Sequence, residues 1–301
     1  FMREELFKNC TLCPRKCNVN RLEGKRGYCG MDGTIRAARA ALHMWEEPCI
    51  SGKKGSGAVF FSGCGLRCCF CQNRDIAIGD SGKEISVERL AEIFLELQEK
   101  GAANLNLVTG AHYVPHIISA LELARGKGMN LPVVYNSSGY ESVETIRRLD
   151  GYVDVYLPDM KYMEPELAAA FSNARDYPQA AQSAIAEMMR QTGPCQFAEN
   201  GYIKRGTIVR HLILPGHTKN SIAVLKYLYR TYGEDIFISV MNQYTPVWKN
   251  EKFPELNRKV TRREYEKVLD AAIELGIENG YFQEGETAEE SFIPAFDYEG
   301  V

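Results

Sequence analysis

Short apolar runs alternate with longer amphipathic stretches between residues 57 and 283 of the chain. Runs of four to eight apolar residues predict buried strands, whereas apolar residues at every third or fourth position predict helices that pack by one face. We expect six strands, at 58–62, 105–108, 133–135, 153–157, 207–214 and 236–240, and a short last one at 280–283. The expected helices cover 87–100, 114–125, 142–149, 165–190, 221–232 and 262–275.

Two features refine this pattern. The helix at 165–190 should be split near Tyr177-Pro178, because proline disfavours helix in the residue before it. Strands that alternate with helices indicate parallel βαβ units with right-handed crossovers. The pattern fits either an open doubly wound sheet or a full or partial barrel, and periodicity does not separate them.

The two ends of the chain differ from this α/β region. Residues 1–56 are rich in Gly, Cys and Arg, show no sustained period, and carry 11 Lys and Arg against 6 Asp and Glu. Residues 278–301 carry 7 Asp and Glu and no Lys or Arg. We therefore expect a cysteine-rich N-terminal metal-binding segment (1–56), an α/β unit (57–283) and an acidic C-terminal tail (284–301). Phe292, Phe296 and Tyr298 are candidate anchors of the tail.

Composition narrows the class of protein. The chain has 301 residues, of which 45% are hydrophobic and 25% charged, so most of it should be globular. The longest apolar runs are far shorter than the roughly 20 residues of a membrane span. The net charge of −3 gives no reason to expect binding to nucleic acid or an anionic membrane. No signal sequence opens the chain, and we expect a cytoplasmic protein.

Cysteine carries the strongest chemical signal. Nine of the ten cysteines lie before residue 72, and in a reducing compartment such clustering points to metal. Cys64, Cys68 and Cys71 form a C-x3-C-x2-C set directly after the strand at 58–62. A structural zinc site needs four ligands, whereas three thiolates on a four-iron cluster leave one iron open for chemistry. The alternatives are a zinc loop completed by a distant ligand, or unliganded buried cysteines. Cys69 is interpreted as a packing residue.

A second set, Cys10, Cys13, Cys17 and Cys29, reads C-x2-C-x3-C-x11-C. Four thiolates could form a structural zinc site or hold an auxiliary 4Fe–4S cluster, and the spacing does not decide between these. Cys49 could join either cysteine set or be an ordinary buried cysteine.

The C-x3-C-x2-C loop, with aromatic Phe70 before its last cysteine, resembles the signature of the radical S-adenosylmethionine (SAM) superfamily. The resemblance implies a partial (β/α)6 barrel and a 4Fe–4S cluster on Cys64, Cys68 and Cys71. In that family SAM chelates the open iron, and one electron from the cluster cleaves it to a 5′-deoxyadenosyl radical that abstracts hydrogen from a substrate.

The same resemblance assigns roles to the segments that follow the later strands. Thr109 and Gly110 would receive the methionine amine of SAM, although the family's Gly-Gly-Glu-like segment lacks its acidic residue here. His112 is either an acid/base group on the substrate side or a packed histidine. The remaining assignments are Asn136 and Ser138 to the ribose, Asp159 to a monovalent cation, and Asn242 or Gln243 to adenosine; the alternatives are a turn at 136–139 and an exposed charged turn at 159–161. Arg210 lies within a strand and needs an anionic partner, for which the methionine carboxylate of SAM is the candidate.

The ordered set of segments is most similar to the activating-enzyme branch, and within it to uncharacterised pyruvate formate-lyase-activating enzyme-like proteins. That branch implies a glycyl radical enzyme as substrate; the alternative is a small molecule or another macromolecule. A flavodoxin or ferredoxin would supply the electron, with the basic segment 1–56 as its predicted docking surface. The hypothesis from a different class is a metal-stapled electron-transfer or binding protein.

Overall fold

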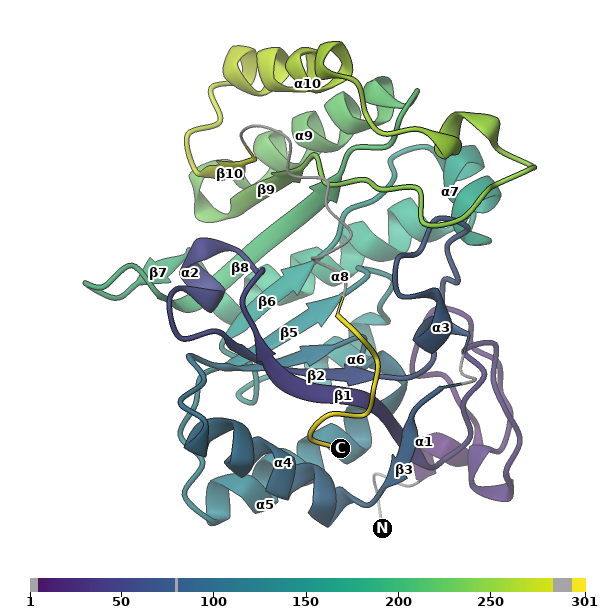
Figure 1. The fold of residues 1–301 in the computed structure, drawn as a ribbon, viewed down its shortest axis with the longest axis vertical. Coiled ribbons are helices and arrows are strands. Elements are labelled where there is room, and N and C mark those ends of the chain that lie inside the picture. The colour runs from purple at the N-terminus through teal and green to yellow at the C-terminus, as the bar shows by residue number, and fades with distance from the viewer. Residues whose placement is uncertain (1–4, 79–80, 284–293) are drawn as a thin grey trace.

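The computed structural model describes residues 5–78, 81–283 and 294–301 (Figure 1). Its centre is a run of seven parallel strands that coincide with the seven expected from the sequence. They are β2 (Ser56–Phe61), β4 (Leu105–Val108), β5 (Val133–Ser137), β6 (Val155–Pro158), β8 (Ile203–Leu212), β9 (Phe237–Met241) and β10 (Gly280–Phe282). The sheet order is β10-β9-β8-β6-β5-β4-β2-β1-β3, and β7 (Gln196–Phe197) pairs with β8.

Helices connect the parallel strands as the periodicity predicts. They are α4 (Val87–Glu99), α5 (Val114–Gly126), α6 (Val143–Arg148), α7 (Pro165–Ser172), α8 (Tyr177–Thr192), α9 (Thr218–Tyr232) and α10 (Arg262–Leu275). Within the described residues no pairing joins β10 to β3, so the α/β sheet forms the expected partial barrel. None of the described helices has the length and apolarity needed to cross a membrane.

Local signals in the sequence set the helix boundaries. The hydroxyls of Ser86 and Ser142 cap α4 and α6, and Thr261 forms a capping box with Glu264 at the start of α10. The predicted split of the fourth helix is confirmed. Asn173 ends α7 in the left-handed conformation, and α8 begins at Tyr177 with proline in its first turn.

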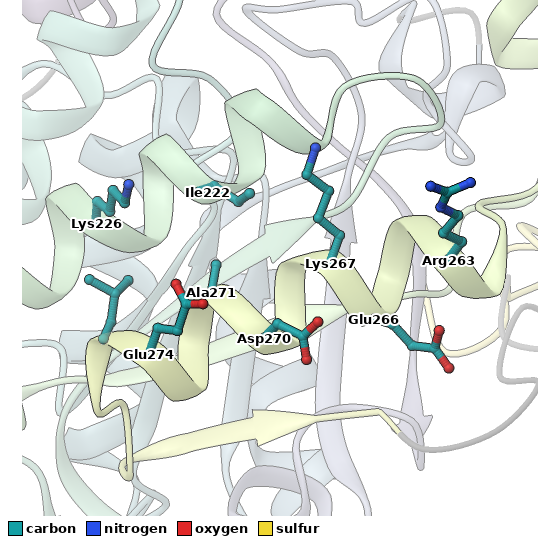
Figure 2. Close-up of a pocket in the computed structure, with 9 residues that line it drawn as sticks. Ile222, Lys226, Arg263, Glu266, Lys267, Asp270, Ala271 and Glu274 are labelled. Carbon is teal, nitrogen blue, oxygen red and sulfur yellow. The ribbon is translucent and has the colours of Figure 1, made fainter.

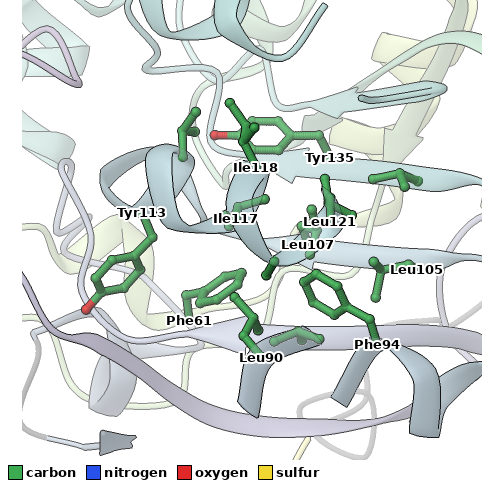
Figure 3. Packing of buried hydrophobic residues seen from close by; sticks show 14 of the residues in the cluster. Phe61, Leu90, Phe94, Leu105, Leu107, Tyr113, Ile117, Ile118, Leu121 and Tyr135 are labelled. Carbon is green, nitrogen blue, oxygen red and sulfur yellow. The ribbon is translucent and has the colours of Figure 1, made fainter. Parts of the chain in front are cut away.

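The larger core lies between the sheet and the helices α4 and α5. Phe61, Leu107 and Tyr135 point from three neighbouring strands toward Phe94 and Ile117 on the two helices (Figure 3), and all five are at most 1% exposed. Burying one such side chain contributes about 1.5–3 kcal/mol, so this contact fixes the register of β2, β4 and β5. The strand ends that carry polar residues are thereby held at one edge of the sheet.

The N-terminal segment contains a strand that the sequence did not indicate. β1 (Ile35–His43) pairs antiparallel with β2, and β3 (Lys83–Ile85) pairs with its first residues. Its sequence, IRAARAALH, buries residues on both faces, so the alternation of a half-buried strand is absent. Alanine also has a low preference for strands. Residues 35–43 therefore belong to the sheet of the barrel.

The last eight residues of the chain lie against β1. The backbone N–H of Tyr298 donates to Ala38, that of Ala40 donates to Glu299, and Phe296 packs edge-on against Phe60 of β2. The predicted anchoring by Phe296 and Tyr298 is therefore present, while Phe292 lies outside the described residues. Figure 1 shows this yellow segment crossing in front of β1.

Candidate active site

The cysteine loop begins where β2 ends. Gly63 has φ +90°, and a Cβ there would lie 2.4 Å from the Met31 side chain and 2.9 Å from the carbonyl oxygen of Cys29. Only glycine fits that position. Backbone bonds from Cys71 to Cys68 (3.1 Å) and from Cys69 to Phe171 (2.8 Å) fix the turn. The loop is thus held between the N-terminal segment and α7.

A cavity of about 240 Å³ brings this loop together with the carboxyl ends of the parallel strands. Cys64, Cys68 and Cys71 line it. Polar groups from the ends of β4, β5, β6 and β8 line it too, as expected for the face of a barrel where sites are built. Six residues assigned from the sequence are among them: Phe70, Thr109, Asn136, Ser138, Asp159 and Arg210.

Two other residues assigned from the sequence lie outside the cavity. Gly110 and Asn242 do not line the cavity, whereas Gln243 does. A Cβ on Gly110 would lie 2.6 Å from the Ile117 side chain, so this glycine serves close packing. The backbone N–H of Asn242 donates to Gln283 at 2.8 Å, which turns that residue toward β10.

Arg210 is the centre of a buried ion-pair network. Its guanidinium donates to Asp159 (3.1 Å), to Glu46 (3.1 Å) and to the side-chain oxygen of Asn136 (2.6 Å). The sequence argument that an arginine within a strand needs an anionic partner is correct. The partners in the structure are two carboxylates of the protein itself, which raise the pKa of Arg210 despite its burial.

Asp159 also contacts a second cation. The Lys161 ammonium lies 2.5 Å from the other carboxylate oxygen. Burial would raise the pKa of Asp159, but Lys161 and Arg210 together hold it below its usual value. The ammonium group of Lys161 therefore occupies the position beside Asp159 where a monovalent cation was expected from the sequence. Asp159 has no oxygen here that is free of a cationic partner.

Glu46, like Lys161, is a site residue that the sequence did not indicate. It lies just before the short helix α2 (Pro48–Ser51), in the arm between β1 and β2. Its carboxylate accepts from Asn106 (2.9 Å), Asn136 (3.2 Å) and Arg210, and thereby joins β4, β5 and β8. The pattern of Glu46-Glu47-Pro48 resembles an exposed acidic turn. Only the sheet topology, which places the arm between β1 and β2 beside the ends of β4, β5 and β8, shows that Glu46 belongs to the site.

Hydrogen-bond donors at two of the three loop thiols, Cys64 and Cys68, suit them to bind iron. Burial raises the pKa of the Cys68 thiol to about 11, while the nearby Lys161 opposes that shift. The Ser172 hydroxyl donates to the Cys68 sulfur at 3.0 Å, and the Leu66 N–H donates to the Cys64 sulfur at 3.4 Å. These donors favour thiolate, which is the form that binds metal.

The N-terminal cysteines lie directly behind this loop. A Cβ on Gly65 would lie 3.7 Å from the Cys13 sulfur, and one on Gly27 would lie 3.5 Å from that of Cys17 and 3.7 Å from that of Cys29. In the described part of the chain no three His, Cys, Asp or Glu side chains are gathered closely enough to hold a single metal ion. A metal on Cys10, Cys13, Cys17 and Cys29 remains a prediction.

Arg15 joins the two cysteine regions. Its guanidinium donates to the carbonyl oxygens of Gly65 (2.8 Å), Ser172 (3.2 Å) and Asn173 (2.5 Å), and lies over the rings of Tyr28 and Tyr140. The arginine is therefore a structural clamp between the N-terminal segment, the cysteine loop and the end of α7.

His112, Cys49 and Cys69 take packing roles. His112 is buried, its Nε2 bonds the Ser62 carbonyl at 2.7 Å, and burial lowers the pKa of its ring to about 3. It does not line the cavity, which favours the packed alternative. Cys49 lies in a small core with residues of β5 and β6, and the partly buried Cys69 packs against the core that contains Phe70 and Phe171.

Two curated proteins are similar to the chain in sequence. An uncharacterized protein of Methanocaldococcus jannaschii is 30% identical over 276 residues, which cover 89% of this chain and 75% of that protein. The pyruvate formate-lyase-activating enzyme of Clostridium pasteurianum is 27% identical over 113 residues, 36% of this chain and 46% of that enzyme.

Solved structures that resemble the chain include Streptococcus suis SuiB bound to S-adenosylmethionine, with a TM-score of 0.47 and 12% identity over 74% of this chain and 48% of SuiB. Another is anSMEcpe with bound AdoMet, with a TM-score of 0.45 and 12% identity over 71% of this chain and 57% of that one. The chain thus spans about half the length of these structures. The family profile of the radical SAM superfamily matches residues 58–228, which include the loop of Cys64, Cys68 and Cys71, and the chain belongs to that superfamily.

Proposed function

We propose that the chain binds a 4Fe–4S cluster through Cys64, Cys68 and Cys71 and uses it to cleave SAM reductively, so that hydrogen is taken from a substrate. The observation that carries the proposal is the shared cavity: the three thiols and the polar ends of β4, β5, β6 and β8 line one space. The cluster, when bound, supplies the electron that breaks the sulfonium bond of SAM.

The protein's own residues would hold and orient SAM in this cavity. The hydroxyl of Thr109 and the polar side chains of Asn136 and Ser138 offer hydrogen bonds at the ends of β4 and β5. Lys161 has one carboxylate partner, Asp159, and its charge acts on both Cys68 and Cys71. Because Arg210 already has two carboxylate partners, Lys161 is the better candidate for the methionine carboxylate.

The test is anaerobic reconstitution, followed by iron and zinc counting, EPR of the reduced protein with and without SAM, and assay of 5′-deoxyadenosine with dithionite as reductant. We expect the EPR signal to change when SAM is added, and 5′-deoxyadenosine to form. Cys71→Ala should lose both, whereas Cys69→Ala, in the same loop but outside the motif, should keep both. If the spectrum stays unchanged and a fully loaded protein forms no deoxyadenosine, the radical mechanism is wrong. The hypothesis of an electron-transfer or binding protein would then remain.

The metal count also tests the N-terminal set. About eight irons per chain would indicate a second 4Fe–4S cluster on Cys10, Cys13, Cys17 and Cys29, and about four irons with one zinc would indicate a structural zinc site.

Activation of a glycyl radical enzyme is the candidate for the substrate. It is favoured by the 27% identity to the C. pasteurianum activating enzyme, which covers 36% of this chain. The test is to mix the reduced, SAM-loaded protein with glycyl radical enzymes from the same source and to record EPR. A glycyl radical signal on the partner would support activation. Deoxyadenosine formation with no signal on any partner would favour a small molecule or another macromolecule.

A further inference from the structure

A second hollow, of about 370 Å³, lies on the outer side of the cysteine loop. Cys68, Cys69 and Cys71 line it together with Arg67, Arg74, Lys249 and Lys252, against a single acidic residue, Glu251. We define Arg67, Arg74, Lys249 and Lys252 as the loop basic patch. The patch borders Cys68 and Cys71, two of the three cysteines that the proposed cluster needs.

These four basic side chains are not neutralised by the protein. Within the described residues no ion pair joins any of them to a carboxylate; instead, Arg74 lies 5.3 Å from the centre of the Trp248 ring and Arg67 lies 5.1 Å from that of Tyr28. Arg74, Lys249 and Lys252 are exposed. Between them lie apolar groups, Trp248 and Ile78, of which Ile78 is 38% exposed.

The basic N-terminal segment, by contrast, uses part of its charge internally. Arg15 and Arg21 bond backbone carbonyls, and Arg21 is 1% exposed. Arg36 is paired with Glu84, and Arg39 with Asp297 and Glu299. Four of the eleven basic residues that predicted a docking surface in residues 1–56 therefore help to hold that segment in place.

We propose that the loop basic patch is the surface on which a small acidic electron-transfer protein docks to reduce the cluster; this rests on the proposed function. The net charge of the chain is −3, so an acidic partner needs a local basic surface to approach. Transient redox complexes bury little area and depend on charge for their association rate. One electron leaves the partner's reduced group and enters the oxidised cluster, so the partner is oxidised by one electron and the cluster reduced by one.

The position of the patch gives the electron a short path. The Trp248 indole donates to the backbone carbonyl of Cys69 at 3.1 Å, so a partner that contacts this ring touches a side chain bonded directly to the cysteine loop. Cys68 and Cys71 line both this hollow and the cavity of the proposed SAM site. A donor in the hollow would therefore lie next to two of the three cysteines that would hold the cluster.

The experiment compares three charge-reversal variants of the cluster-loaded protein. Arg74→Glu/Lys252→Glu tests the loop basic patch, and Lys53→Glu/Lys54→Glu tests the N-terminal segment. Lys226→Glu/Lys267→Glu is the matched control. It makes the same charge change in the groove of about 600 Å³ between α9 and α10, where both lysines are exposed (Figure 2).

Two quantities are measured for each variant. The first is the affinity for oxidised flavodoxin, and in parallel for ferredoxin, by titration calorimetry at about 50 and about 300 mM salt. The second is the rate of 5′-deoxyadenosine formation with the reduced donor and, separately, with dithionite. We expect Arg74→Glu/Lys252→Glu to weaken binding of at least one donor about tenfold at low salt, and much less at high salt. The same variant should slow deoxyadenosine formation with the reduced donor by a similar factor, and leave the rate with dithionite unchanged.

Each other outcome is decisive. An equal loss of affinity in all three variants would mean that only net charge matters, and a loss confined to Lys53→Glu/Lys54→Glu would place the donor on the N-terminal segment. No loss for either donor in any variant would also overturn the proposal. If the parent protein forms no deoxyadenosine even with dithionite, the proposed function has failed, and the binding data still show whether the patch binds acidic proteins.

Discussion

Replacing Glu46 with alanine removes the carboxylate that joins three strands of the barrel. The change deletes three hydrogen bonds to an ionised carboxylate, from Arg210, Asn106 and Asn136. Hydrogen bonds to a charged group contribute about 1.5–3 kcal/mol each. Because Arg210 keeps Asp159 as a partner, we expect a loss near the lower end of the sum, about 4 kcal/mol in the free energy of unfolding.

Urea denaturation of proteins with matched iron content measures this loss. Glu46→Gln keeps the size and one acceptor oxygen, so it should lose only about 1–2 kcal/mol, and it serves as the milder variant if alanine prevents folding. Glu166→Ala is the control. Its carboxylate forms an exposed pair with Arg175, with both side chains about 70% exposed, and should contribute at most about 0.5 kcal/mol. A loss below about 1 kcal/mol for Glu46→Ala would refute the network as a stabilising element.

Three further changes test other parts of the structure. Burial lowers the pKa of His211 to about 4, so as the pH falls the unfolded state binds a proton on this residue before the folded state does. As the pH is lowered from 6.5 to 4, this group should therefore reduce the free energy of unfolding by up to about 1.4 kcal/mol per pH unit. His211→Gln should remove that share of the slope in urea midpoints. Gly139→Ala places a Cβ 2.1 Å from the carbonyl oxygen of Asp159 at φ +76°, and thermal unfolding should show a loss of about 2–4 kcal/mol. Phe296→Ala removes the ring that packs on Phe60 and should make the C-terminus more susceptible to limited proteolysis, with a loss of about 1–2 kcal/mol.

The parallel strands and their helices could be predicted from the sequence because each has a strong local pattern. β2 is buried at every position, and α4 begins at a serine that caps it. β1 could not be predicted in this way, because its burial depends on β2 on one edge and on the C-terminal residues that lie beside it. Its structure is set by contacts distant in sequence, which periodicity does not record.

The same distinction holds for the site. The cysteine motif and the polar residues just after each strand could be predicted to lie together, because the carboxyl ends of parallel strands meet at the same edge of the sheet. Glu46 was missed since its partners lie on three other strands, and Asn242 was assigned to the cavity although the backbone turns it toward β10. The partner of Arg210 was expected to be a ligand, and the structure places carboxylates of the protein there.

The Glu46–Arg210 pair has a consequence for how the protein is made. The two residues are 164 positions apart, and translation proceeds at roughly 5–20 residues per second, so the carboxylate would wait about 10–30 s on the ribosome for its cation. The cysteine loop emerges early in that interval, before β8 exists to complete the wall beside it. The three thiols of the loop are therefore synthesised well before the strand that closes the cavity beside them.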